Sequence, residues 1–225
     1  MAQRWNDLLF AHWPLPPEPL RRALPPQLPL DTRDGAAWIG VVPFYLSRLR
    51  ASWLPALPGL RAFPELNVRT YVTLDGKPGV YFFSLDAGNP AAVAGARLMS
   101  INYYYAWMAI RRRGDLIGYA SQRLFPLTRA ARFRAAYRPT GSAAPPASGT
   151  LAHWLTERYC LYAVDRRGRV GRLEIHHSPW RLQEAEAEIE VNTMTSPIGL
   201  ALPDRPPLLH FSRRQDMVGW MPEPA

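Results

Sequence analysis

Features that would narrow the function of this protein are scarce in its sequence of 225 residues. Cysteine occurs once, as Cys160, so the chain can form neither an internal disulfide nor a zinc site built from several cysteines. No apolar run reaches the roughly 20 residues that a membrane-spanning helix needs. The N-terminal segment has Asp7 and His12 inside its apolar run and no small-residue cleavage site. We therefore expect a cytoplasmic protein with no membrane partner.

Lysine is almost absent as well. Of the 27 basic residues all but Lys77 are arginine, and the formal net charge is +9. Such a charge can indicate nucleic-acid binding, but the arginines are scattered, with short clusters at 111–113, 166–167 and 213–214. A nucleic-acid groove would interleave basic and aromatic residues along one face, and the sequence contains no such stripe. We expect no specific nucleic-acid partner.

Motifs for common metals and cofactors are also missing. The five histidines include no H-x-x-x-H or H-x-H spacing, and the adjacent His176 and His177 would point to opposite faces of a strand. The chain has no G-x-S-x-G motif, no P-loop and no Rossmann fingerprint. We accordingly expect no metal and no cofactor, and we assign the histidines structural roles.

The sequence does contain a large apolar content arranged in short β-rich runs. Hydrophobic residues make up 48% and aromatic residues 12% of the chain, which is enough for a substantial core. Segments 65–74 and 80–87 flank the turn-forming sequence DGKPG and predict a hairpin, and segment 159–177 predicts a second one. The further candidate strands are 36–46, 103–111, 116–124, 131–138, 186–194 and 207–220.

Short helices are predicted between these strands. The sequence PPEPLRRAL suits one, and Asn89 followed by Pro90 is typical of the start of another. Segment 150–158 predicts a third, with Thr150 or Ser148 as its cap. Strands that follow one another through tight turns predict an antiparallel sheet, and about eight of them favour a barrel, with a sandwich as the alternative. We expect a mainly β fold, an antiparallel β-barrel with two or three short peripheral helices, in a single domain spanning 1–225.

One predicted hairpin carries a polar face. Polar and apolar residues alternate along segment 65–74, and successive side chains of a strand point to opposite faces. A four-residue loop at 75–78 would place two polar residues of the partner strand on the same face. The resulting cluster would consist of Glu65, Asn67, Arg69, Ser84 and Asp86.

Tyr119, Ser121 and Arg123 share a strand face in the same way. The polar residues admit two interpretations, the solvent-facing side of a half-exposed sheet or the lining of a pocket inside the barrel. Charges in such a pocket must be paired, because unpaired burial is expensive. The pocket is favoured, because apart from Glu65 these residues are Asn, Arg, Ser, Asp and Tyr, and not the Lys/Glu/Thr mixture typical of free surface.

Five segments, in order along the chain, resemble the YqjF-like family of uncharacterised bacterial proteins. They are residues 12–44, FPELNVRTYV (63–72), GVYFFSLDA (79–87), LTERYCLY (155–162) and IHHSPW (175–180). The resemblance covers roughly residues 4–185, and the family is similar to a distant branch of the acetoacetate decarboxylase superfamily. It implies a cone-shaped antiparallel β-barrel with a central cavity and short helices outside, in agreement with the strand pattern.

The decarboxylase mechanism uses a lysine that forms a Schiff base with the keto group and is activated by a neighbouring cation. The enzyme's motif resembles G-R-E-x-x-x-x-P-K-K, and the corresponding sequence here is GARLMSINYYYAW. Aligned on Arg97, Tyr104 and Tyr105 stand where the two lysines would be, and Tyr103 takes the proline position. A phenol cannot form an imine, and Lys77 lies in a predicted turn. The resemblance therefore implies a protein that lacks the Schiff-base route.

The resemblance also suggests where other site residues lie. A carboxylate of the enzyme matches Glu65, whereas its other acidic residue and its substrate-binding arginine fall near Gly40 and Asn6, which match neither. Only one of Tyr104 and Tyr105 can face the cavity, because neighbours alternate along a strand. We expect it to be Tyr104, at the position of the first lysine.

We interpret the chain as a protein with a small-molecule pocket for a carboxylate or enolisable ligand, since guanidinium groups bind carboxylates bidentately. The expected ligand-binding residues are Asn67, Arg69, Asp86, Arg97, Tyr119, Ser121 and Arg123. In a catalytic alternative, a lyase- or isomerase-like enzyme, Glu65 and Tyr104 would be the acid/base and hydrogen-bonding groups. In a third alternative, the apolar loop 51–64 docks a protein partner or a second copy in a homo-oligomer.

Overall fold

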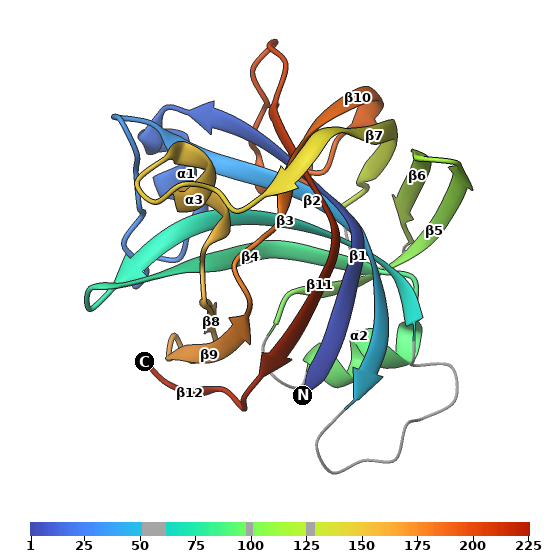
Figure 1. Cartoon of the computed structure of the whole chain (residues 1–225). Helices are drawn as coiled ribbons and strands as arrows, with labels where there is room; N and C mark the ends of the chain where they lie inside the picture. The colour runs from blue at the N-terminus through green and yellow to red at the C-terminus, as the bar shows by residue number, and fades with distance from the viewer. Residues whose placement is uncertain (51–61, 98–100, 125–128) are drawn as a thin grey trace.

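The computed structural model of the chain describes residues 1–50, 62–97, 101–124 and 129–225 (Figure 1). Within these ranges one twelve-stranded sheet dominates. Its strands are β1 (Ala2–Leu15), β2 (Ala37–Arg50), β3 (Ala62–Leu74), β4 (Lys77–Ala87), β5 (Tyr103–Arg113), β6 (Leu116–Arg123), β7 (Arg132–Ala144), β8 (Cys160–Val164), β9 (Val170–His177), β10 (Leu182–Asn192), β11 (Leu208–Gly219) and β12 (Glu223–Pro224). The helices of the same ranges are α1 (Pro17–Ala23), α2 (Pro90–Arg97), α3 (Leu151–Thr156) and the 3₁₀ turn Ser196–Ile198.

The sheet forks at two strands and so closes on itself twice. The first half of β4 pairs with β8, and its last residues pair with β5. Strand β11 in turn pairs with β10 near its start and with β9 near its end. The shared strands β11, β1, β2, β3 and β4 therefore belong to two rings, a smaller one completed by β8 and β9 and a larger one completed by β5, β6, β7 and β10 (Figure 1).

Each shared strand presents one face to each ring, and the alternation of its residues decides which side chains enter which ring. Leu66 and Val68 of β3 pack in the main hydrophobic core with Tyr119 and Phe133, inside the larger ring. The intervening residues of β3 face β8 and β9. A mainly β architecture with short helices outside is confirmed.

The hairpin between β3 and β4 differs from the predicted one. Its turn consists of two residues, Asp75 and Gly76, both with positive φ, and Leu74 pairs directly with Lys77. Such a left-handed pair is the turn that matches the twist of a two-residue hairpin, and glycine adopts it at no steric cost. The expectation of a four-residue loop at 75–78 is wrong, and the error moves the partner strand by two residues, which leaves the faces of its side chains unchanged.

A β-bulge adds a second shift in the same hairpin. Val68 pairs with Ser84, but the next residue, Arg69, pairs with Phe82. Phe83 is thus the extra residue of β4, and an extra residue exchanges the faces of all that follow it. The bulge, and not the short turn, therefore decides which polar residues of β4 share a face with those of β3.

The predicted helix caps are present. Asn89 Oδ1 accepts hydrogen bonds from the backbone N–H groups of Ala91 and Ala92, both at 3.1 Å, at the start of α2. Thr150 Oγ1 accepts a bond from the N–H of His153 at the start of α3. No helix in the described part of the chain is long and apolar enough to cross a membrane.

Strand β1 is the main element that the sequence did not predict. Its residues alternate imperfectly, and Asp7 adopts a positive φ of 50° at an irregularity in the pairing with β2. The strand nevertheless lies at the centre of the sheet, between β2 and β11. Pairing on both sides stabilises the extended conformation even where the local pattern is weak.

Candidate ligand-binding site

A cavity of about 90 Å³ lies inside the smaller ring, bounded by β1 to β4 on one side and by β8 and β9 on the other. Much of its wall is apolar, with Leu8, Val42, Phe44, Phe82, Leu85, Leu161, Leu173, Ile175 and Trp180. Its polar side chains are Gln3, Glu65, Asn67, Arg69, Tyr103, Thr156, Arg158 and His177. An apolar cavity with a few convergent polar groups is the usual form of a small-molecule site.

Glu65 is the buried carboxyl group of this cavity. Its residue is 3% exposed, and the Tyr103 hydroxyl donates a hydrogen bond to Glu65 Oε2 at 3.0 Å. Burial raises the pKa of Glu65 to about 8, and the bond from Tyr103 partly opposes this shift. Glu65 is therefore mostly protonated at neutral pH and lies close to the point at which it can either give or take a proton.

The backbone at Glu65 is held from the larger ring. The Tyr119 hydroxyl donates hydrogen bonds to the carbonyl oxygens of Glu65, at 2.7 Å, and Phe44, at 3.3 Å. Tyr119 is itself buried in the main core. Tyr119 thus fixes the strand that carries the carboxyl group without reaching the cavity.

Arg69 is the buried cation of the cavity, and its guanidinium is oriented from one side. Arg69 Nη2 donates to the carbonyl oxygen of Leu155 at 3.0 Å and to the Tyr71 hydroxyl at 3.3 Å. Tyr71 in turn lies 2.6 Å from His12 Nε2. Burial holds the pKa of His12 well below its usual range, so the ring that is hydrogen-bonded to Tyr71 is neutral.

The close approach of His12 and Arg69 requires glycine on the neighbouring strand. A Cβ atom at Gly40 would lie 2.9 Å from His12 Cδ2 and 3.4 Å from Arg69 Cγ. Any larger residue would push the imidazole or the arginine stem away from its present place. Gly40 thus has a packing role beside the site.

Several buried polar atoms of the cavity wall have no hydrogen-bond partner within the described residues. They are Trp5 Nε1, Asn67 Oδ1, Arg69 Nε, Arg158 Nη2 and Trp180 Nε1. All except Asn67 Oδ1 belong to N–H donors, and two of these belong to guanidinium groups. Buried donors that stay unpaired cost about 1–3 kcal/mol each, so the wall is suited to an anionic, oxygen-rich ligand.

The two guanidinium groups differ in their counterions. Arg158 Nη1 forms an ion pair with Asp31 Oδ2 at 2.8 Å. Arg69 makes no ion pair with any described residue, and segments 51–61, 98–100 and 125–128 contain no aspartate or glutamate. Arg69 is 8% exposed, so its charge is buried without a carboxylate, which is costly unless an anion binds there.

The predicted polar face of β3 is confirmed, because Glu65, Asn67 and Arg69 share it and line the cavity. The expectation that Tyr104 faces the cavity is wrong. Strand β5 pairs with β4 so that Tyr103 lies beside Leu85, on the cavity side, and Tyr104 lies beside Asp86, on the opposite side. The parallel register therefore gives the position beside Glu65 to the first tyrosine of the run.

Other predicted ligand-binding residues gather outside the cavity. Arg123 binds Asp86 through two hydrogen bonds, at 2.6 and 3.0 Å, and both side chains are at most 2% exposed. The Tyr104 ring lies 4.1 Å from Arg123 Cζ. Ser84, Ser121 and Tyr119 are buried as well and line no part of the cavity. The bulge at Phe83 explains why the predicted cluster is divided between two faces.

Arg97 lies outside the cavity too. It is exposed at the end of α2, and its Nε donates to the Tyr103 carbonyl oxygen at 2.8 Å. Lys77 begins β4 and pairs with Glu174, away from the cavity wall. The apolar loop 51–64 falls largely outside the described residues, since only its last residues belong to β3.

Three cavity residues were missed by reasoning from the sequence, namely Arg158, His177 and Trp180. All three lie in segments LTERYCLY and IHHSPW, which carry part of the family resemblance, so a signal was present. His177 is buried and His176 exposed, as alternation predicts. Burial lowers the pKa of His177, and its Nδ1 lies 2.8 Å from the Ser178 carbonyl oxygen. No three His, Cys, Asp or Glu side chains gather as a metal site in the part of the chain that the structure describes.

Comparisons with known proteins assign this arrangement to a family. Residues 2–216 match DUF2071, a family described as an uncharacterized conserved protein. The chain belongs to this family. The uncharacterized protein YqjF of Bacillus subtilis is 51% identical over 221 residues, which cover 98% of this chain and 90% of that protein.

Solved structures show that the family shares the fold of the acetoacetate decarboxylases. An acetoacetate decarboxylase-like enzyme from Sphingomonas wittichii matches 100% of this chain and 93% of its own, with a TM-score of 0.65 and 14% identity. The enduracididine biosynthesis enzyme MppR, complexed with pyruvate, matches 98% of this chain and 89% of its own, with a TM-score of 0.65 and 12% identity. At such identities the likeness establishes the fold alone.

Proposed function

We propose that the cavity binds a small carboxylate with a keto or enolisable carbon next to it. The observation that carries this proposal is the buried guanidinium of Arg69, a residue of the cavity wall that has no carboxylate partner among the described residues and whose Nε is unpaired. Arginine binds a carboxylate through parallel hydrogen bonds. An anionic ligand would satisfy these donors and offset the cost of burying the charge.

The remaining polar groups suit the other end of such a ligand. Glu65 is mostly protonated at neutral pH, so it can donate a hydrogen bond or a proton to a carbonyl oxygen. Tyr103 keeps the carboxyl group in place through the bond to Oε2. The similar fold of MppR holds pyruvate, a keto acid of the proposed class, which supports the choice of ligand.

Schiff-base chemistry is not part of the proposal. Lys77 is the only lysine of the sequence, it is paired with Glu174 and it lies outside the cavity wall. The protein would therefore bind its ligand without a covalent bond, and it would not act as an acetoacetate decarboxylase of the lysine type.

Catalysis without an imine is the second candidate function, and the position of Glu65 favours it. A carboxyl group whose pKa is about 8 can shuttle a proton near neutral pH. With the ligand carboxylate at Arg69, Glu65 would protonate a carbonyl oxygen or a carbanion, as a lyase or an isomerase requires. Tyr103, and not Tyr104, would be its hydrogen-bonding partner.

Calorimetric titration with pyruvate and acetoacetate tests the proposal. We expect binding by the unmodified protein, and we expect Arg69→Gln to weaken it by about 10- to 100-fold, because a hydrogen bond to a charged group contributes about 1.5–3 kcal/mol. Arg111→Gln removes the same charge from the exposed β5–β6 hairpin and should leave the affinity unchanged. The proposal would be refuted if Arg69→Gln bound both acids with the same affinity as the unmodified protein.

Turnover separates the two candidate functions. Proton exchange at the ligand carbon next to the carbonyl group, followed by NMR in heavy water, is expected for an enzyme and not for a binding protein. Glu65→Gln should abolish this exchange while pyruvate still binds, since Arg69 is intact. Exchange that survives in Glu65→Gln would exclude Glu65 as the acid/base group.

A further inference from the structure

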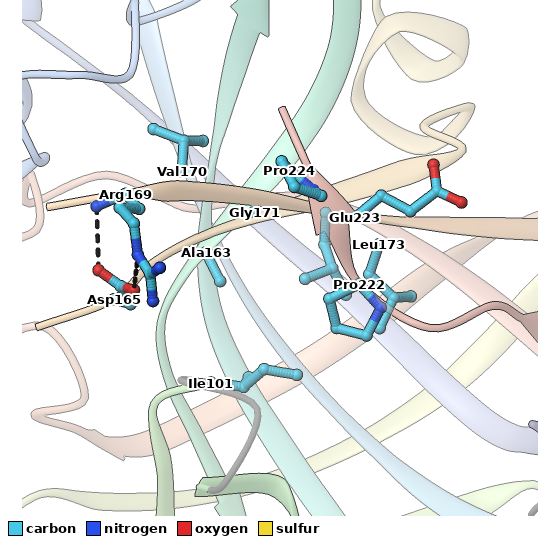
Figure 2. Close-up of a pocket in the computed structure, with 11 residues that line it drawn as sticks. Ile101, Ala163, Asp165, Arg169, Val170, Gly171, Leu173, Pro222, Glu223 and Pro224 are labelled. Atoms are coloured by element: carbon cyan, nitrogen blue, oxygen red, sulfur yellow. Dashed lines mark hydrogen bonds and ion pairs between the residues drawn. The ribbon is translucent and has the colours of Figure 1, made fainter. Parts of the chain in front are cut away.

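Three hollows of the molecule meet at one residue, Ile101. Besides the cavity, a groove of about 290 Å³ runs between the β8–β9 hairpin and the C-terminal segment, and a second groove of about 460 Å³ lies beside the start of β5. All three have Ile101 in their walls. Figure 2 shows Ile101 pointing into the first groove from below, opposite Pro222 and Leu173. Ile101 thus lies between the buried cavity and the surface.

The second groove is strongly basic. Four arginines line it, Arg97, Arg166, Arg167 and Arg169, together with one acidic residue, Asp165. Arg169 pairs with Asp165, with Nε and Oδ2 2.7 Å apart, and Figure 2 shows this pair at the edge of the first groove. The other three arginines form no ion pair within the described ranges and are exposed. The groove therefore carries a positive charge that its own side chains leave uncompensated.

Tyr103 connects this basic groove to the cavity. Its residue lines both hollows. Its hydroxyl is bonded to Glu65 Oε2, and its carbonyl oxygen accepts the bond from Arg97 Nε. Arg97 also lies over the Tyr104 ring, with Cζ 5.6 Å from the ring centre. The guanidinium of Arg97 is thereby held about one tyrosine side chain away from the buried carboxyl group.

The size of the cavity limits what it can hold. A volume of about 90 Å³ accommodates a group of a few heavy atoms, whereas the basic groove is several times larger. A longer ligand must therefore place only its small acid end at Arg69 and extend past Ile101 toward the surface. Its far end would then lie among the unpaired arginines.

We propose that the groove of Arg97, Arg166 and Arg167 binds a phosphoryl group at the far end of an elongated ligand whose small acid end occupies the cavity. This inference rests on the proposed function for the acid end, but not for the phosphoryl site itself. Arginine's planar fork matches phosphate oxygens bidentately. A doubly charged phosphoryl group also compensates the three unpaired cations better than a single carboxylate does.

Inorganic phosphate is the first probe. Calorimetry at low ionic strength should detect phosphate binding by the unmodified protein, at least tenfold weaker in the double variant Arg166→Gln/Arg167→Gln. The matched control Arg111→Gln/Arg113→Gln removes two charges from another hairpin tip and should bind phosphate as before. No phosphate binding by the unmodified protein, or binding lost equally in both double variants, overturns the groove. Phosphate binding that is lost only in Arg69→Gln would place phosphate in the cavity and would also overturn the groove as the phosphate site.

A series of ω-phosphono carboxylic acids of two to eight carbons tests whether one ligand spans both places. At the matching chain length we expect affinity at least about tenfold above that of the carboxylic acid without the phosphonate, because the second contact becomes intramolecular. The gain should vanish in Arg166→Gln/Arg167→Gln. No gain at any length, or a gain that persists in that variant, overturns the spanning ligand.

Dicarboxylic acids of the same lengths distinguish a phosphoryl group from a second carboxylate. A gain equal to that of the phosphono acids would overturn the assignment of a phosphoryl group. Pyruvate binding tests the proposed function separately. The Arg166→Gln/Arg167→Gln variant should still bind pyruvate. Pyruvate binding that is absent from the unmodified protein would refute the proposed function, while the phosphate titration still decides about the groove.

Discussion

The Tyr103 hydroxyl donates a hydrogen bond to Glu65 Oε2 at 3.0 Å, and the next residue, Tyr104, turns to the opposite face of β5. Two buried groups that both prefer to be neutral are thereby joined, since burial raises the pKa of Glu65 to about 8 and holds that of Tyr103 well above its usual range. The pair is therefore uncharged at neutral pH and presents a proton to the cavity.

Replacement of Tyr103 should raise the pKa of Glu65. The bond from the phenol stabilises the ionised carboxylate and so opposes the effect of burial. In Tyr103→Phe we expect the titration of Glu65 to shift above pH 8, as followed by ¹³C NMR of carboxyl-labelled glutamate. Tyr104→Phe is the matched control and should leave this titration unchanged. A shift in Tyr104→Phe and none in Tyr103→Phe would show that Tyr104, and not Tyr103, is the hydrogen-bonding partner of Glu65.

Stability should fall with rising pH because of Glu65. Its pKa is about 8 in the folded protein and about 4.3 in an unfolded chain. Between these values the folded state binds the extra proton, so the free energy of unfolding decreases by up to about 1.4 kcal/mol per pH unit. Below pH 4 the contribution is complete, and above pH 8 it is lost.

Glu65→Gln should remove this decrease, because glutamine does not titrate. Urea unfolding gives the free energy of unfolding of each protein at pH 5 and at pH 8. The decrease between the two pH values should be smaller in the variant than in the unmodified protein. The same difference in both proteins would show that Glu65 ionises normally in the fold.

The Asp86–Arg123 pair should affect stability and leave ligand binding intact. Arg123→Met leaves the Asp86 carboxylate buried without its partner, which typically costs about 3–5 kcal/mol. The double variant Asp86→Leu/Arg123→Met should recover much of the loss, because no buried charge remains. Pyruvate affinity in the double variant should equal that of the unmodified protein. A large drop in affinity would place the pair at the ligand site after all.

Borohydride should trap no covalent adduct with acetoacetate. Imine formation requires a free amine at the cavity, but Lys77 is paired with Glu174 elsewhere, and the Met1 amine at the wall donates to the Gly219 carbonyl oxygen at 2.6 Å. Intact-mass spectrometry after incubation with acetoacetate and borohydride should show the unmodified mass. An adduct mapped to Lys77 would overturn the non-covalent mechanism. Lys77→Arg serves as the control for reaction at that side chain.

The sequence by itself determined the fold class and one half of the candidate site. The alternation along 65–74 puts Glu65, Asn67 and Arg69 on one face, because successive side chains of any strand point to opposite sides. The caps at Asn89 and Thr150 were predictable for a similar reason, since they depend on bonds within one turn of helix. The absence of a second lysine also limits the covalent chemistry without any structure.

Only the tertiary structure decided which residues of other segments meet that face. The two-residue turn shifts the register of β4 by two residues and keeps its faces, whereas the bulge at Phe83 shifts it by one residue and exchanges them. Asp86 and Arg123 consequently pair away from the cavity, and Tyr103 takes the place expected for Tyr104. Arg158 and His177 reach the cavity through pairing between segments far apart in the chain. Such pairing depends on how the sheet forks at β4 and β11, and no local pattern in the sequence encodes it.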